Sequence, residues 1–273
     1  MTGLRGVRKN LLILTLVFGG VLHAANEQAL WRLWGTHNEN PDDHMGTIKA
    51  CMDYVRANPN DPLVPVAQSL AGWHYLKLGE TEKGIALLEP LITKTKEAPG
   101  QGANQLARNW MSRVDREAVK VALQVYYRQK VQYPANLQFL AENPKVNTTC
   151  TYREKDRWDR PWRYRPTGLK GIPGFEGQSF ILESSRLNSS SILTEALELP
   201  YATKSPLVPL RVMSTGNGTQ MIQFKSAEGE NQEVLGISVG QGNKELFVAY
   251  VGNNIVVVCD ENHWILFLKP GRE

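Results

Sequence analysis

The chain has 273 residues, of which 42% are apolar and 21% are charged, as in an ordinary folded protein of one to three domains. Its formal net charge is +4, and three of its cations (Arg5, Arg8 and Lys9) lie in the first 24 residues, which hold no anion. The remainder would carry a net charge of +1. That charge is too small to attract a phosphate backbone, so nucleic acid is not expected as a partner.

Residues 1–24 have the pattern of an export signal. The three cations precede an apolar run at Leu11–Leu22, and Leu22-His23-Ala24 precedes a possible cleavage site. The run is shorter than the roughly 20 residues that span a bilayer. We expect a cleaved signal peptide and an exported chain, periplasmic or membrane-associated and facing the periplasm. The alternative is an uncleaved anchor, the one case in which a membrane would be a partner.

The chain contains three cysteines, Cys51, Cys150 and Cys259, which lie far apart. Export would permit one disulfide, whose pairing the sequence does not specify; three buried free thiols are the alternative.

Residues 25–98 are predicted to be helical and repeat-like. At an offset of 34 residues, Ala50, Tyr54 and Ala57 align with Gly84, Leu88 and Leu91, and Gly72-x-x-Tyr75-x-x-x-Gly79 lies between them. This pattern resembles the tetratricopeptide repeat, in which small residues let two antiparallel helices approach closely. An unrelated helical hairpin is the alternative. The resemblance implies protein binding, with a core assigned to Trp73, Tyr75 and Leu88.

The segment from His37 to His44 contains residue types that bind metals, including Asp42 and Asp43. Because the two acids precede a predicted helix, we interpret them as N-caps and expect no metal.

Residues 99–186 are predicted to form an α+β unit. A helix over residues 104–130, about 40 Å long, has an apolar stripe that needs a sheet to cover it. Its members are Leu106, Trp110, Val114, Ala118, Val121 and Val125. The helix leads to Tyr133-Pro134, and a strand is predicted at Ser179–Glu183.

Between the helix and the strand lies an aromatic, proline-containing motif. It runs from Asp156 through Trp158 and Pro161 to Trp162. The order of helix, Tyr-Pro and Asp-x-Trp-x-x-Pro-aromatic resembles the globular part of type II secretion major pseudopilins over residues 102–186. The resemblance implies that Tyr133, Pro134, Asp156, Trp158, Pro161 and Trp162 fix a loop against the helix and a small sheet.

Two features depart from that family. The chain has no prepilin cleavage motif before an apolar half-helix, so polymerisation by the family's route is not expected. After Ser184 the chain reads Ser-Arg-Leu-Asn-Ser-Ser-Ser, without the carboxylates that a calcium site needs. We therefore predict no calcium and no other cofactor.

Residues 187–205 are predicted to be a linker with a short helix at 190–197, and residues 206–273 a small all-β barrel or sandwich. The expected strands, separated by turn residues, are Leu207–Met213, Gln220–Lys225, Glu233–Val239, Glu245–Val251, Asn254–Cys259 and His263–Leu268. This spacing resembles the homology region of the type II secretion inner-membrane protein that contacts the secretin, and the related type IV pilus lipoprotein.

Gly236-Ile-Ser238-Val-Gly240 matches a nucleophile elbow, with Asp260 and His263 downstream. An elbow needs a strand, a tight turn and a helix, whereas a β pattern follows here. We expect a hairpin turn, no catalytic residue and no small-molecule substrate.

The sequence thus predicts an α+β fold with N-terminal helical hairpins, a pseudopilin-like helix-and-sheet unit and a C-terminal β unit. The expected function is a non-catalytic exported scaffold in a type II secretion or type IV pilus-like assembly, with a secretin or pseudopilus component as the expected partner. One alternative is a periplasmic protein-binding module unrelated to secretion. The other is a secreted serine hydrolase that uses Ser238.

Overall fold

A computed structural model describes residues 25–93, 97–168, 178–201, 207–214, 216, 218–226, 234–242 and 246–270. The helices are α1 (Glu27–Glu39), α2 (His44–Ala57), α3 (Val64–Lys77), α4 (Thr81–Leu88), the 3-10 turn η1 (Glu89–Ile92), α5 (Ala98–Lys130), α6 (Gln138–Ala141), α7 (Pro144–Thr149) and α8 (Leu193–Glu198). The strands are β1 (Arg163–Thr167), β2 (Ser179–Glu183), β3 (Leu207–Ser214), β4 (Gln220–Ser226), β5 (Val234–Ser238), β6 (Phe247–Val251), β7 (Ile255–Cys259) and β8 (Trp264–Leu268). The predicted α+β class is confirmed.

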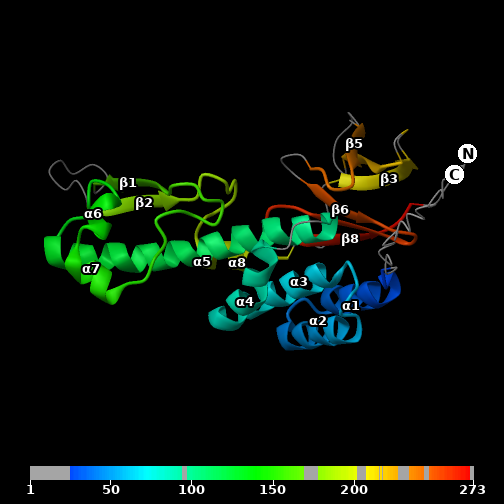
Figure 1. Cartoon of the computed structure of the whole chain (residues 1–273), viewed down its shortest axis with the longest axis horizontal. Coiled ribbons are helices and arrows are strands. Elements are labelled where there is room, and N and C mark those ends of the chain that lie inside the picture. Colours follow the sequence, from blue (N-terminus) through cyan, green and yellow to red (C-terminus); the bar gives the residue numbers. More distant parts are fainter. Residues whose placement is uncertain are drawn as a thin grey trace, which may run out of the picture.

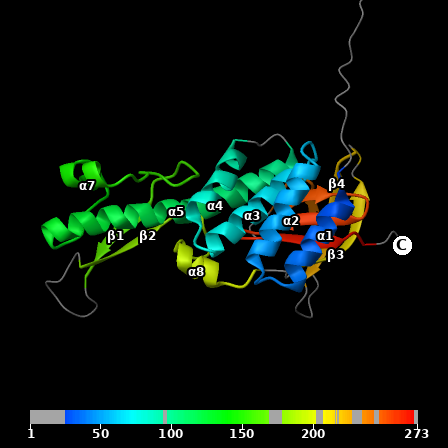
Figure 2. The same cartoon turned by 90° about the horizontal axis from the view of Figure 1, so that it is seen from below.

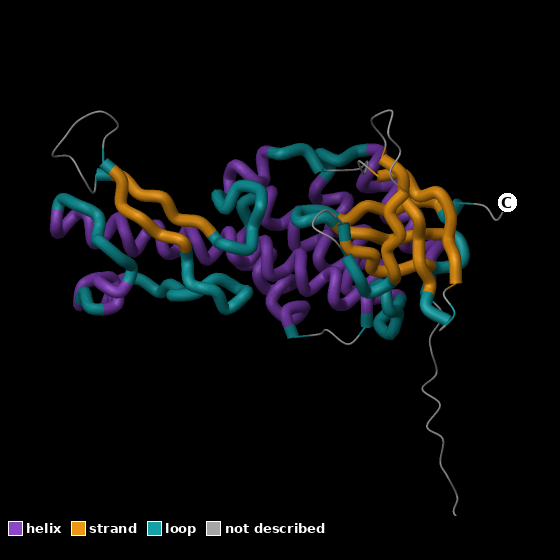
Figure 3. Tube along the Cα trace, turned by 90° about the horizontal axis from the view of Figure 1, so that it is seen from above, coloured by secondary structure: helices purple, strands orange, loops and turns teal. Residues whose placement is uncertain are grey.

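The molecule consists of a body and an arm joined by α5 (Figure 1). The body contains α1 to α4, the first half of α5 and the six C-terminal strands. The arm contains the second half of α5, the short helices α6 and α7, and the β1–β2 hairpin. Figure 3 shows the two groups of strands at opposite ends of the molecule.

The front helices begin where polar side chains cap them. The Asn26 side chain accepts a hydrogen bond from the Ala29 amide at the start of α1, and Asp43 accepts one from Gly46 at the start of α2. Each cap satisfies one of the amides that a helix N-terminus leaves unpaired. The predicted capping role of Asp43 is therefore observed.

Helices α3 and α4 approach closely at two glycines. A Cβ atom at Gly72 would lie 2.8 Å from Leu88, and one at Gly84 would lie 2.9 Å from Leu76. Leu88 is fully buried, as the repeat-like pattern predicts. The prediction that Tyr75 belongs to this core is wrong. Tyr75 is half-buried and lies outside the core, and the adjacent residue Leu76 fills the gap between the two helices. One residue along a helix is a turn of about 100°, which carries Tyr75 away from α4.

Replacing Gly72 with alanine should therefore destabilise the body. The added methyl overpacks a fully buried contact, which costs about 1–3 kcal/mol and exceeds the gain of up to about 1 kcal/mol in helix propensity. Gly35→Ala in α1 is the matched control, because nothing lies within 4 Å of its Cβ position. Urea unfolding should show a lower midpoint for Gly72→Ala only. Equal midpoints for the two variants would mean that the close approach does not limit stability.

Helix α5 contributes to two separate hydrophobic cores. It has 33 residues, starts six residues before the predicted position and spans about 50 Å. In the first half of α5, Leu106 and Trp110 lie in the core of the body, as predicted. In its second half, Val119 and Leu123 face the core of the arm. The predicted stripe fails at Val121, which is 51% exposed. A single stripe cannot describe a helix that packs against different partners at its two ends.

The arm is a small hairpin folded against α5. Strands β1 and β2 pair antiparallel, with Tyr164 opposite Leu182. Its core contains Leu140 and Val146 from the short helices, Trp162 from the loop before β1, and Leu182. Helix α5 ends at Lys130, before Pro134, and Val131 adopts a left-handed conformation at its C-cap.

The C-terminal strands form two antiparallel sheets, β3-β4-β5 and β6-β7-β8, and among the described residues they do not close into a barrel. Ile222 and Phe224 of the first sheet share a core with Val256 and Val258 of the second. The sandwich alternative of the prediction therefore holds. Glu233 and Glu245, the predicted first residues of two strands, lie outside the described residues, and β5 and β6 begin at Val234 and Phe247.

The second sheet is buried on both faces. One face packs on the β3-β4-β5 sheet, and the other contributes Val257 and Trp264 to the core that α1, α3 and α5 line (Figure 2). The Trp264 indole donates a 2.6 Å hydrogen bond to Ser69 of α3. One hydrophobic core thus continues from the segment before residue 98 to the C-terminal strands.

All three cysteines are free thiols, as in the alternative without a disulfide, but only Cys51 and Cys259 are buried and Cys150 is half-buried. Within the described part of the chain, every helix is too short or too polar to cross a bilayer. The expected signal peptide at residues 1–24 lies outside the described residues.

Candidate functional site

The loop between α7 and β1 is folded around Asp156, whose side chain is fully buried. One carboxylate oxygen accepts hydrogen bonds from the amides of Trp158 (2.9 Å) and Arg160 (3.0 Å). The other accepts one from the Ser184 hydroxyl at 2.7 Å. Since Ser184 directly follows β2, a single carboxylate fixes both the loop and the end of the hairpin. We call residues 156–162 the clasp loop.

The clasp loop is also attached to α5. The Trp158 indole donates to Asn109 at 2.9 Å, and the Arg157 amide donates to the Ser112 hydroxyl at 3.1 Å. The Arg157 guanidinium forms an ion pair with Asp115, with a second hydrogen bond of 3.1 Å. These contacts hold the loop at the middle of α5, between the two cores.

The remaining aromatic residues of the predicted set lie toward the arm. Trp162 is buried in the core of the arm and donates to the Arg153 carbonyl at 2.9 Å. Tyr133 packs edge-on against Phe180, and the Pro134 carbonyl accepts a hydrogen bond from Tyr164 at 2.7 Å. Pro161 is exposed and contributes backbone only, through a bridge to Lys155.

A fully buried arginine joins the body to the segment after β2. Arg113 of α5 donates to the Ser190 carbonyl (3.0 Å), the Asn262 side chain (2.6 Å) and Glu261 (3.2 Å). Its guanidinium also lies 4.5 Å from the centre of the Trp110 ring. Burial lowers the pKa of Arg113 to about 10, so the side chain stays charged at neutral pH.

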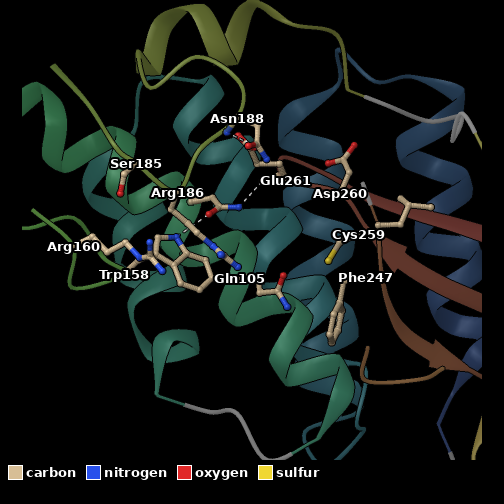
Figure 4. A pocket seen from close by; sticks show the side chains of 12 residues that line it. Gln105, Trp158, Arg160, Ser185, Arg186, Asn188, Phe247, Cys259, Asp260 and Glu261 are labelled. Atoms are coloured by element: carbon tan, nitrogen blue, oxygen red, sulfur yellow. Dashed lines mark hydrogen bonds between the residues drawn. The ribbon is translucent and has the colours of Figure 1, made fainter. Parts of the chain in front are cut away.

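Beside this joint lies a cleft of about 520 Å³, shown in Figure 4. Four segments line it: α5, the clasp loop, residues 185–188, and the strands of the second sheet near residues 246–247 and 259–261. Trp158, Arg160 and Arg186 gather on one side, and Phe247, Cys259 and Asp260 on the other (Figure 4). Burial holds the pKa of the Cys259 thiol well above its usual value, so this cysteine is a poor nucleophile.

Trp73 belongs to the core of the body, as predicted, and packs edge-on against Tyr201. Around these rings lie four histidines that are distant in the sequence. His74 contacts His37 at 3.2 Å and His44 at 3.0 Å through its two ring nitrogens, and Tyr201 packs against both His37 and His263. In the described ranges, no group of three or more histidine, cysteine or acidic side chains could hold a metal ion.

Burial keeps these histidines neutral. It lowers the pKa of His37 to about 4, that of His74 to about 2 and that of His263 to about 3. Their role in the structure is therefore that of polar core residues.

Comparisons of this chain with protein-family models, curated proteins and solved structures found no match.

The features of a nucleophile elbow are not brought together. Ser238 ends β5 and is followed by a turn at Gly240 (φ 79°), and the next described element is the strand β6. Within the described residues, the Nε2 atom of His263 has no hydrogen-bond partner. No Ser238–His263 pair forms in this geometry.

Sequence reasoning missed Arg113 and the histidine cluster. A single arginine on a helix is usually solvated, and only its position next to Trp110, in the middle of the apolar stripe, hinted at burial. The histidines carry no shared sequence signal, because the fold alone brings them together.

Proposed function

We propose that this chain is a non-catalytic exported scaffold, an accessory or structural component of a type II secretion or type IV pilus-like assembly that acts through protein contacts. The observation that carries this proposal is the arrangement of the clasp loop. Hydrogen bonds of buried Asp156 connect the clasp loop to Ser184, and Trp162 packs beside α5. This is the helix, loop and hairpin arrangement that the resemblance to pseudopilins implies.

The continuity of α5 also supports a structural role. The helix runs without a break from the body into the arm, and buried polar contacts of Arg113 and Asp156 hold the segments around its middle. Such a connection fixes the arm at a set distance and direction from the body. A scaffold that holds partners in place needs this rigidity.

A periplasmic protein-binding module unrelated to secretion is the second candidate. The cleft beside Trp158 favours it, because binding modules use concave surfaces with a few polar groups. The two candidates differ in the identity of the partner.

Cross-linking in the native host separates the two candidates. The tagged full-length chain is expressed at its native level, cross-linked in intact cells and purified, alongside an equally abundant tagged exported protein as control. We expect a secretin or a pseudopilus component to be enriched over the control. Recovery of other periplasmic proteins alone would favour the second candidate and contradict the first.

A further inference from the structure

The acidic and basic side chains that line the cleft beside the clasp loop differ in whether they have hydrogen-bond partners. Its acids already have partners: Glu261 accepts hydrogen bonds from the amides of Asn188 and Ser189 and pairs with Arg113. Asp260 accepts hydrogen bonds from the amides of Asn262 and His263. Glu261 is thus engaged through both of its oxygens, whereas both hydrogen bonds of Asp260 go to Oδ1.

The two arginines of the cleft, unlike its acids, have no hydrogen-bond partner for their side chains among the described residues. Arg160 and Arg186 are exposed, and among the described residues neither guanidinium has a hydrogen-bond or ion-pair partner. The Arg186 guanidinium lies 4.8 Å from the centre of the Trp158 ring, which orients it at the wall of the cleft. On this wall of the cleft the charge available to a ligand is therefore positive.

The neighbouring groups suit a peptide. The half-buried Trp158 ring and Phe247 supply apolar surface, and the Gln105 and Asn188 side-chain amides, unpaired within the described part of the chain, can bond to a peptide backbone. Arginine pairs well with carboxylates because its planar donors match two oxygens.

We propose that this cleft binds an acidic segment of a partner protein, with a Glu or Asp carboxylate between Arg160 and Arg186 and an apolar neighbour on Trp158. This proposal specifies the chemistry of the partner. It rests on the proposed function only in assuming that the partner is a component of the assembly.

The test uses purified full-length chain and a fluorescein-labelled peptide, Gly-Ser-Glu-Phe-Glu-Ser-Gly, followed by fluorescence anisotropy. Binding should weaken about tenfold in the Arg160→Gln/Arg186→Gln double variant, because charge-assisted hydrogen bonds are lost. The same loss is expected for the peptide with both glutamates changed to glutamine. Arg32→Gln/Arg128→Gln is the matched control: both arginines are exposed and lie outside the cleft, and binding should be unchanged.

Three results would overturn the proposal. They are no binding of the acidic peptide, equal binding of the acidic and glutamine peptides, and equal loss in both double variants. Full competition by inorganic phosphate at equal concentration would also overturn it and would assign a general anion site instead. Because the assay contains no assembly component, a failure of peptide binding contradicts only the proposal for the cleft. A negative cross-linking result contradicts only the proposed function.

Discussion

Replacing Arg113 with alanine should lower the free energy of unfolding by about 3–5 kcal/mol, the range expected when one partner of a buried ion pair is removed. The guanidinium is fully buried and bonds to four groups outside α5: the Ser190 carbonyl, the Ser189 hydroxyl, the Asn262 side chain and Glu261. Alanine would remove these hydrogen bonds and open a cavity beside Trp110, and Glu261 would keep only those from residues 188 and 189. Urea unfolding followed by tryptophan fluorescence measures the change.

Arg128→Ala is the matched control, because Arg128 is an exposed arginine near the end of the same helix. Its effect should stay within about 0.5 kcal/mol, as for most surface substitutions. A double-mutant cycle of Arg113→Met with Glu261→Gln then isolates the pair itself. If Arg113→Ala unfolds at the same urea concentration as the wild type, Arg113 does not hold the body to residues 188–190.

Local patterns predicted the elements of this fold well. The spacing of Leu106 and Trp110 predicts a helix where α5 lies, a strand is predicted at residues 179–183 where β2 lies, and Asp43 is predicted as a cap. Asp156, Trp158 and Trp162 were named together because their order resembled a known loop, and the structure brings them together around α5. Each of these signals extends over fewer than about 35 residues, the range in which periodicity and capping operate.

Partners distant in the sequence could not be predicted in the same way. Periodicity shows which face of a helix is buried, but it does not show that Val119 and Leu106 face different cores. Val121 was assigned to the stripe because the stripe was assumed to be continuous. The repeat-like pattern assigns Tyr75 to the core, whereas Leu76 lies there in the structure, because the packing of α3 on α4 sets which side of the helix is buried.

The candidate cleft depends on the least predictable contacts. Its walls come from α5, the clasp loop and the second sheet, and they meet because Glu261 binds the backbone of residues 188 and 189. Asp260 and Glu261 lie between two predicted strands, where the local pattern indicates only a turn. The contact of Glu261 with a distant loop follows from the packing of the sheet on α5, which no local pattern encodes.

Lowering the pH from 7 to 5 should destabilise the protein strongly, because three histidines are buried in their neutral form. His37, His74 and His263 have pKa values of about 4, 2 and 3 in the folded protein, lowered chiefly by burial. In the unfolded chain a histidine has a pKa of about 6.5. Between these values the unfolded chain binds more protons, so the free energy of unfolding falls as the pH falls.

The contribution of each histidine is fully present above pH 6.5 and is lost progressively below it. The loss approaches about 1.4 kcal/mol per pH unit for each histidine, or roughly 2 kcal/mol each between pH 7 and pH 5. Asp260, whose Oδ2 lies 3.9 Å from Nδ1 of His263, opposes this loss, because burial raises its pKa above 3.8 and the folded protein therefore binds that proton before the unfolded chain does. Arg113 lowers the pKa of His263 further.

Urea unfolding at pH 7, 6 and 5 measures the slope of stability with pH. His263→Gln keeps a neutral polar side chain but removes one proton-binding group, so its slope should be smaller by about 1.4 kcal/mol per pH unit. His44→Gln is the comparison variant, because His44 is only partly buried and its pKa is less strongly lowered. A free energy of unfolding that stays constant from pH 7 to pH 5 would mean that water reaches the cluster. The histidines would then titrate as exposed side chains, and the body would not depend on their neutrality.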